Sequence, residues 1–269
     1  MNIIKRCKHG LMAFNSRDIW IGKSFIVYGE YSESEINLFK QVIKSGDTVI
    51  DVGANIGSLT VPFSRIVGPT GTVLAFEPER TAFCTVAGNV AINNIRNTFC
   101  FHQAVGATQG VINVPELDLE KTINFGGLEL DKDYSASAHY PVALITLDGI
   151  GLVKCDFIKI DVEGMELHVL KGASKTIDEL RPLLYVETDR FDRAEELIKF
   201  IKDKDYVIYQ HEAVFFNPDN FYEEKVNVFG DTISLNLLGV PREKSIDVNV
   251  PRLVRLDETP IPNPPEPTV

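Results

Sequence analysis

The sequence predicts one α/β domain with a mostly parallel sheet and helices on both faces. Short apolar runs alternate with amphipathic helical patterns along most of the 269 residues, as in strands joined by crossover helices. Several apolar runs end directly in a glycine or an acidic residue. The carboxyl ends of parallel strands meet at one edge of a sheet, where ligands bind. The pattern therefore predicts an α/β fold with one ligand-binding edge.

The first 46 residues are expected to form a hairpin followed by a helix. Residues 18–28 are predicted as two short strands around Gly22 and Lys23. Ser32 and Glu35 have the spacing of a capping box, which predicts a helix that ends at Gly46.

The main domain is predicted over residues 47–240. Its expected strands lie at 48–52, 71–76, 98–105, 111–114, 142–147, 156–161, 183–187, 206–209 and 232–238. Its expected helices lie at 57–67, 79–93, 163–179 and 191–201. The last two strands have no helix between them, which predicts an antiparallel edge. Residues 115–141 are polar and weakly patterned, and are predicted as an insertion above the sheet. Residues 241–269 contain seven prolines and are predicted as a tail.

Composition narrows the possible partners. Lys and Arg total 27 against 38 Asp and Glu, a formal net charge of −11, which argues against a nucleic-acid partner. No run approaches the roughly 18 apolar residues of a membrane span. The four cysteines are scattered, without metal-ligand spacing, as in reduced thiols of a cytoplasmic protein.

The segment Val49–Gly57, VIDVGANIG, carries the most chemical information. It predicts a buried strand that delivers Asp51 to its end, followed by a tight turn with Gly53 and Gly57. A dinucleotide phosphate would require the spacing G-x-G-x-x-G, which is absent. An acidic residue at this position instead favours a ligand with a positive centre.

Four further acidic residues lie at the ends of predicted strands. Glu77 lies in the segment AFEP at 75–78, at the end of a predicted strand. Beside a glycine turn, it is placed to accept the hydroxyls of a ribose. Asp161 and Glu163 end the run DFIKIDVEG and are expected in the same crevice, although Glu163 also suits the start of the following helix. Glu187 ends the strand LLYVE.

Six segments occur together in a characteristic order: DVGANIG, AFEP, Asn93-Asn94, HQAVG, Leu147-Asp148 and DFIKIDVEGMELHVLKGA. In this order and spacing, over about residues 28–210, the chain resembles the FkbM-type family of S-adenosylmethionine-dependent methyltransferases. The resemblance implies a Rossmann-like class I methyltransferase fold, with a seven-stranded sheet whose last strand is antiparallel. Residues 1–46 would then cover the cofactor site.

The resemblance also implies roles for individual residues, with S-adenosylmethionine as the cofactor. Asp51, Gly53, Asn55 and Gly57 would line its methionine end, and Glu77 would hold its ribose. Gln103 and Ala104 would lie beside the adenine. Asp161 would lie near the cofactor's amino group and the reacting methyl, and Asp161 and Glu163 are the candidate catalytic proton acceptors.

Family members mostly methylate hydroxyl oxygens, so the resemblance implies an O-methyltransferase that acts on a small-molecule or glycan acceptor, with a sugar hydroxyl as the expected target. A polyketide or other secondary metabolite is the alternative. Metal assistance is a further alternative, since Asp161, Glu187 and Asp189 offer oxygen ligands for a hard cation. Phe125, Tyr134 and Tyr140 are candidates for stacking on a sugar ring.

Overall fold

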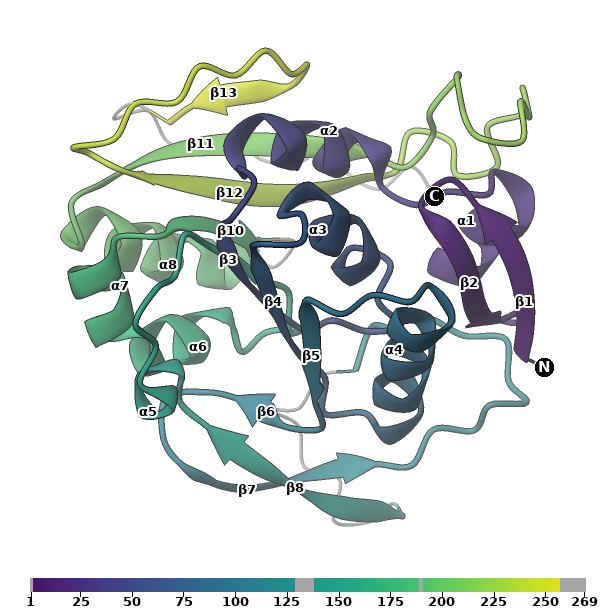
Figure 1. Cartoon of the computed structure of the whole chain (residues 1–269), viewed down its shortest axis with the longest axis horizontal. Helices are drawn as coiled ribbons and strands as arrows, with labels where there is room; N and C mark the ends of the chain where they lie inside the picture. Colours follow the sequence, from purple (N-terminus) through teal and green to yellow (C-terminus); the bar gives the residue numbers. More distant parts are fainter. Residues whose placement is uncertain (1, 129–137, 189–190, 257–269) are drawn as a thin grey trace.

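The structure is a computed structural model that describes residues 2–128, 138–188 and 191–256. A central eight-stranded sheet has the strand order β13-β11-β12-β10-β9-β3-β4-β5 (Figure 1). Its strands are β3 Thr48–Val52, β4 Thr72–Phe76, β5 Thr98–Phe101, β9 Phe157–Ile160, β10 Leu183–Glu187, β11 Tyr206–Val214, β12 Ile233–Pro241 and β13 Leu253–Arg255.

The five strands β10, β9, β3, β4 and β5 pair in parallel. Strand β12 lies between β10 and β11 and is antiparallel to both. The α/β fold and the seven-stranded sheet with an antiparallel last strand are therefore confirmed. The tail adds an eighth strand that was not predicted, because β13 pairs with the outer edge of β11.

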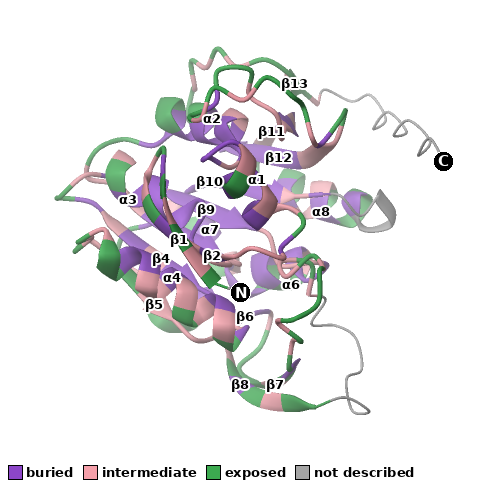
Figure 2. Ribbon diagram, turned by 90° about the vertical axis from the view of Figure 1, so that its right-hand side faces the viewer, coloured by how far each residue is buried: buried purple, intermediate pink, exposed green. Residues whose placement is uncertain are grey.

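Helices cover both faces of this sheet. Helices α2 Glu33–Val42, α3 Thr60–Ile66 and α4 Arg80–Ile92 pack against one another, as do α5 Leu147–Ile150, α6 Glu166–Gly172, α7 Ser174–Leu180 and α8 Phe191–Asp203. Alternate strand residues enter two separate cores: Tyr185 of β10 packs with α2 and α3, and its neighbours Leu184 and Val186 pack with α6 to α8. The central strands β3, β9 and β10 are accordingly buried on both faces (Figure 2).

The prediction for residues 18–28 is wrong. The N-terminal hairpin lies earlier, as β1 Asn2–Cys7 and β2 Gly10–Asn15, and helix α1 Ile21–Val27 follows it. The Asp18 carboxylate accepts hydrogen bonds from the backbone N–H groups of Trp20, at 2.8 Å, and Gly22, at 3.1 Å. These bonds satisfy donors at the start of a helix, so the local side-chain chemistry favours a helical turn over a strand.

Two predicted helices differ in detail. Helix α2 ends at Val42, before Gly46, and Ser32 Oγ donates to the Glu35 carboxylate instead of binding a backbone N–H. The helix predicted over 163–179 is divided into α6 and α7. Asp148 accepts the backbone N–H groups of Lys175, at 2.9 Å, and Thr176, at 2.8 Å, and thereby stabilises a second helix start.

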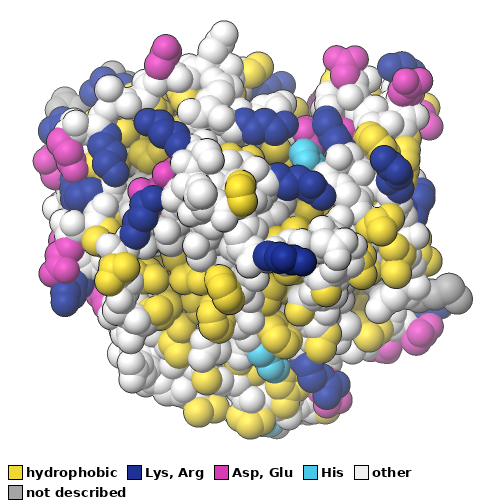
Figure 3. Space-filling model, in the orientation of Figure 1, with side chains coloured by type: hydrophobic (Ala, Val, Ile, Leu, Met, Phe, Trp, Pro, Cys, Tyr) yellow, Lys and Arg dark blue, Asp and Glu magenta, His cyan; other side chains and the backbone are white. Residues whose placement is uncertain are grey.

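Three further strands form a small second sheet. Its strands β6 Ala104–Val105, β7 Gly110–Pro115 and β8 His139–Ile145 have the order β6-β8-β7. Together with β5 it lies in the lower half of the view in Figure 1, where hydrophobic side chains are frequent on the surface (Figure 3). Phe99 of β5 and Val111 of β7 are among the exposed hydrophobic residues. In the described ranges of the chain, no helix is both long enough and apolar enough to cross a bilayer.

Candidate active site

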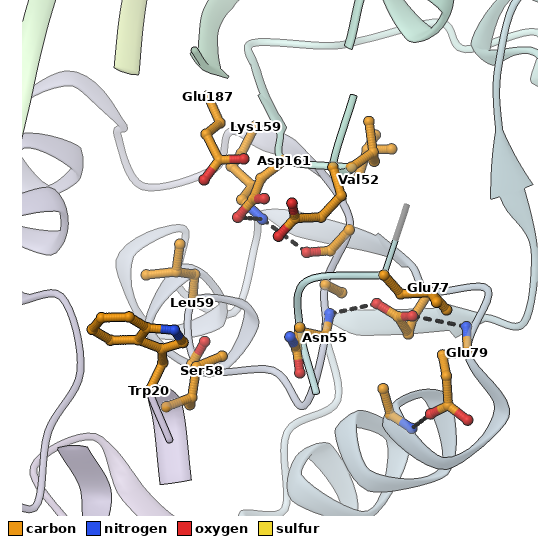
Figure 4. Close-up of a pocket in the computed structure, with 18 of the residues that line it drawn as sticks. Trp20, Val52, Asn55, Ser58, Leu59, Glu77, Glu79, Lys159, Asp161 and Glu187 are labelled. Atoms are coloured by element: carbon orange, nitrogen blue, oxygen red, sulfur yellow. Dashed lines mark hydrogen bonds and ion pairs between the residues drawn. The ribbon is translucent and has the colours of Figure 1, made fainter. Parts of the chain in front are cut away.

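A cavity of about 330 Å³ lies at the carboxyl ends of the central strands. One side is formed by the turns after β3, β4 and β5, with Gly53, Asn55, Glu77, Gln103 and Ala104, and is called the glycine-turn wall below. The other side, called the aromatic wall, contains Trp20, Tyr31, Phe125 and Phe215. Figure 4 shows Glu77 and Trp20 on opposite sides of the cavity, with Lys159, Asp161 and Glu187 grouped near its upper part in this view.

The glycine turn after β3 is tightly packed against β9. Gly53 has φ of +79°, and a Cβ atom there would lie 1.7 Å from the backbone oxygen of Asp161. Only glycine accepts both the positive φ and this approach. Gly53 also lines the cavity, where a ligand can contact the backbone of the turn directly.

Glu77 connects the end of β4 with this turn. Its carboxylate accepts the backbone N–H of Asn55 at 2.7 Å and that of Glu79 at 2.8 Å (Figure 4). The side chain is buried, and burial raises its pKa to about 7. Two backbone donors fix the orientation of the carboxylate, and each of its oxygens can accept further hydrogen bonds from a ligand in the cavity.

Lys159 is a site residue that the sequence did not indicate. Lys159, in the middle of β9, is buried, and its Nζ donates to the Gly53 oxygen at 2.8 Å. The same Nζ lies 3.5 Å from Asp51 Oδ1 and 3.3 Å from Asp161 Oδ2. The nearby carboxylates raise the pKa of Lys159 against the opposing effect of burial. The signal that could have identified it is a lysine inside an otherwise apolar strand, since a buried cation requires acidic partners.

Asp51 lies behind the cavity instead of facing it. It is fully buried, and Thr60 Oγ1 donates to its Oδ2 at 2.6 Å. Burial raises the pKa of Asp51, and Lys159 opposes that effect. Among the described residues that line the cavity, Asp51 and Gly57 do not appear, whereas the other predicted site residues do: Gly53, Asn55, Glu77, Gln103, Ala104, Asp161 and Glu163.

Three carboxylates meet at the ends of β9 and β10. Single oxygens of Asp161, Glu163 and Glu187 lie within 4.8 Å of one another. Oxygen donors of this kind suit a hard cation. However, the Lys159 ammonium already lies against Asp161, and its positive charge opposes a second cation there. Asp189, the third oxygen ligand considered from the sequence, lies outside the described residues.

The aromatic wall brings together segments from both ends of the chain. The ring of Trp20 lies 5.3 Å from that of Phe215 and 5.6 Å from that of Phe229, and Tyr31 lies 5.8 Å from Phe215. Of the aromatic residues predicted to contact an acceptor, Phe125 lines the cavity. Tyr140 instead accepts the backbone N–H of Arg80 at 2.6 Å, and Tyr134 lies outside the described residues.

Comparison with known families decides the identity of the chain. The pattern of the methyltransferase FkbM domain matches residues 51–208, which is more than half of the sequence. The chain belongs to the FkbM methyltransferase family. The matched residues of this FkbM protein include the glycine turn, Glu77, Lys159 and Asp161.

Two curated relatives of this FkbM protein are also methyltransferases. Methyltransferase sdnD of Sordaria araneosa is 26% identical over 210 residues, which cover 66% of the present chain and 80% of the relative. Methyltransferase 1 of Beauveria bassiana is 26% identical over 144 residues, which cover 46% and 57% of the two chains.

Among solved structures, a methyltransferase FkbM from Methylobacillus flagellatus aligns with a TM-score of 0.47 and 21% identity. The alignment covers 72% of the present chain and 44% of that protein, so the FkbM chain described here matches less than half of its length. An S-adenosylmethionine-dependent O-methyltransferase from Thermotoga maritima aligns with a TM-score of 0.46 and 13% identity, over 79% and 66% of the two chains.

Proposed function

We propose that this FkbM protein is an S-adenosylmethionine-dependent O-methyltransferase that methylates a sugar hydroxyl. The observation that carries the proposal is the position of Glu77, whose carboxylate is held by the backbone N–H groups of Asn55 and Glu79 beside an open glycine turn. The same cavity contains Asp161 and Glu163. A ribose-binding acid and candidate proton acceptors thus share one space.

The glycine-turn wall fits such a cofactor. Glu77 would accept the two ribose hydroxyls, and the turn at Gly53 and Asn55 would contact the methionine end. Gln103 and Ala104 would lie beside the adenine, and the apolar side chains of Phe76, Ala82 and Val105 also line the cavity. Asp161 would pair with the cofactor's ammonium group. The acidic character of the cavity suits the positive sulfonium, which a phosphate-bearing dinucleotide lacks.

The cofactor, when bound, supplies a methyl group on a positively charged sulfur. The residues of the chain then have two tasks, which are to align the acceptor hydroxyl with that methyl and to receive its proton. Asp161 and Glu163 are proposed for the second task because both line the cavity. Lys159 keeps Asp161 in place through their 3.3 Å ion pair.

The aromatic wall supports a sugar acceptor. Sugar rings stack on aromatic faces and form hydrogen bonds with polar side chains at their edges. Trp20 and Phe215 supply rings here, while Asn124, Ser234 and Asn236 add polar groups to the same cavity. Ile21, Leu59 and Ile233 also line it, and these apolar contacts favour the second candidate, a hydroxylated secondary metabolite such as a polyketide.

The cysteines support a cytoplasmic location. None of Cys7, Cys84, Cys100 and Cys155 forms a disulfide, as expected in a reducing compartment.

The decisive experiment is titration calorimetry with S-adenosylmethionine and S-adenosylhomocysteine, with NADH as the control. Micromolar binding of both sulfur compounds and no binding of NADH is expected; binding of neither sulfur compound would contradict the proposal. Transfer is then measured from S-adenosylmethionine labelled in its methyl group, with methyl glycosides and hydroxylated apolar compounds as acceptors. Adding EDTA or Mg²⁺ tests the metal-assisted alternative.

A further inference from the structure

Glu35, on the first turn of α2, is a carboxylate in the cavity with no role in the proposal so far. Its side chain lines the cavity although the residue is only 7% exposed. Ser32 Oγ donates to one of its oxygens, and the Tyr185 hydroxyl lies within hydrogen-bonding reach of the carboxylate. The hydrogen-bonding partners found for Glu35 in the described part of the chain are thus neutral hydroxyl groups.

This environment differs from that of Asp161. The Asp161 carboxylate lies 3.3 Å from the Lys159 ammonium, and a direct cation stabilises the charged form of a carboxylate. Glu35 is more deeply buried than Asp161, whose side chain is 39% exposed, and its hydrogen bonds come from hydroxyls alone. The two acids thus differ in their partners, which are hydroxyl groups for Glu35 and an ammonium group for Asp161.

Two buried residues fix the position of Glu35. Tyr185 of β10 and His211 of β11 are each 1% exposed, and the Tyr185 hydroxyl lies 2.8 Å from His211 Nδ1. Burial lowers the pKa of His211 to about 4, so its ring is neutral at pH 7 with one N–H. If Nδ1 carries that proton and donates to the Tyr185 oxygen, the Tyr185 hydrogen is directed to Glu35.

We propose that Glu35, in place of the candidates Asp161 and Glu163, is the catalytic base that takes the proton of the acceptor hydroxyl, with Tyr185 and His211 as positioning residues. The inference rests on the proposed methyl transfer. In that step the acceptor oxygen forms a bond to the methyl carbon while the sulfur–methyl bond breaks and its electron pair stays on sulfur. The acceptor O–H bond breaks, and the proton passes to the Glu35 carboxylate, so charge and atoms balance.

The charged surroundings of Glu35 are consistent with this role. The titratable groups that face it are Tyr31 of the preceding turn, Lys159 and Asp161 of β9, and Tyr185 of β10. Asp161 and Lys159 act in opposite directions, and burial dominates, raising the pKa of Glu35 to about 7. A base with a pKa near the working pH has a substantial ionised fraction and also a high proton affinity, and both favour proton transfer.

The test uses two probes, sinefungin and S-adenosylhomocysteine. Sinefungin carries an ammonium-bearing carbon where the cofactor has its sulfur and methyl, so its extra charge reports on groups beside the transferred methyl. Calorimetry at pH 8 measures the ratio of the affinities for sinefungin and for S-adenosylhomocysteine. In the Glu35→Gln variant this ratio should be about tenfold lower than in the wild type. Its affinity for S-adenosylhomocysteine should stay within about twofold, which also shows that the variant is folded.

The Glu33→Gln variant is the matched control. Glu33 lies on the same helix but pairs with Lys8 at 3.0 Å, away from the cavity lining, so the ratio of the two affinities should not change. An unchanged ratio in Glu35→Gln, with S-adenosylhomocysteine still bound, overturns the inference and leaves the proposed function standing. A wild-type protein that binds neither probe overturns the proposed function itself.

Tyr185→Phe tests the positioning role. The Tyr185 hydroxyl lowers the pKa of Glu35 by stabilising its ionised form. Without that hydroxyl, the pH at which the preference for sinefungin is half developed should move upward from its wild-type value near 7. A purely structural role of Tyr185 would leave that midpoint in place, and an unchanged midpoint therefore overturns the positioning role.

Discussion

The ammonium group of Lys159 donates a 2.8 Å hydrogen bond to the carbonyl oxygen of Gly53. This bond ties the middle of β9 to the turn that follows β3, although the two residues are 106 positions apart. The same ammonium lies between Asp51 and Asp161. One buried side chain thus sets the geometry of the turn and of two carboxylates.

Replacing Lys159 should destabilise the fold strongly. In Lys159→Met, the buried Asp51 loses the cation beside it, and uncompensated buried charge costs about 3–5 kcal/mol of unfolding free energy. Urea unfolding at pH 7 measures the change. Lys175→Met removes an exposed ion pair with Glu179 at 3.9 Å and should cost less than about 1 kcal/mol. Equal losses in the two variants would contradict this assignment of Lys159.

A methyl group at Gly53 should abolish binding of the cofactor. In Gly53→Ala the added carbon meets the Asp161 oxygen at 1.7 Å, so the turn and β9 must separate. Gly88→Ala is the matched control, because nothing lies within 4 Å of a Cβ there and alanine should stabilise helix α4 by about 0.5–1 kcal/mol. Calorimetric titration with S-adenosylhomocysteine, together with urea unfolding, compares them. Wild-type affinity of Gly53→Ala for S-adenosylhomocysteine would contradict the close contact between Gly53 and the Asp161 backbone.

Removal of the Glu77 carboxylate should weaken binding of S-adenosylhomocysteine. Glu77→Ala loses the proposed acceptor of both ribose hydroxyls, and hydrogen bonds to a charged group contribute about 1.5–3 kcal/mol, or roughly tenfold to a hundredfold in affinity. Asp148→Ala provides a control, since Asp148 also accepts two backbone N–H groups but does not line the cavity. Unchanged affinity in Glu77→Ala would remove the ribose assignment.

The ligand-free protein should become less stable as the pH rises from 5 to 8. The pKa of Glu35 is raised from 4.5 to about 7 in the folded state, so the folded protein binds more protons than the unfolded chain in this range. The contribution of Glu35 to the free energy of unfolding is complete below pH 4.5 and is lost as the pH passes 7. Its upper limit is about 3 kcal/mol. Urea unfolding at several pH values should show a smaller decrease for Glu35→Gln than for the wild type. Parallel curves would contradict the raised pKa.

The central strands were predictable because they are buried on both faces. The runs at 48–52 and 183–187 coincide with β3 and β10. A continuous apolar run bounded by glycine, proline or acidic residues is typical of a buried strand in an α/β fold. Gly53 and Glu77 were predictable as site residues for the same reason, because each comes directly after a recognisable buried strand.

Other features depend on contacts that no local pattern contains. In the sequence, Lys159 resembles a solvent-facing strand residue. Its acidic partner Asp51 lies on β3, 108 positions earlier in the chain, so only the fold reveals the ion pair. Glu35 has the spacing of a capping residue, and its place in the cavity depends on Tyr185 across the sheet. Strand β13 was missed because a three-residue strand gains its pairing only from the exposed edge of β11.

The aromatic wall has a consequence for how acceptor choice can diverge. Its N-terminal part, at Trp20 and Tyr31, and its C-terminal part, at Phe215, flank the segment that carries the proposed cofactor-binding residues, and Phe125 lies within that segment. The two parts also bind each other, since the Tyr28 hydroxyl donates to the Val226 oxygen at 3.0 Å. A chimera that takes only one terminus from a relative would break this contact. Under the proposed function, exchanging both termini together would preserve this contact and change Trp20, Tyr31 and Phe215 at once, while the proposed cofactor-binding residues stay unchanged.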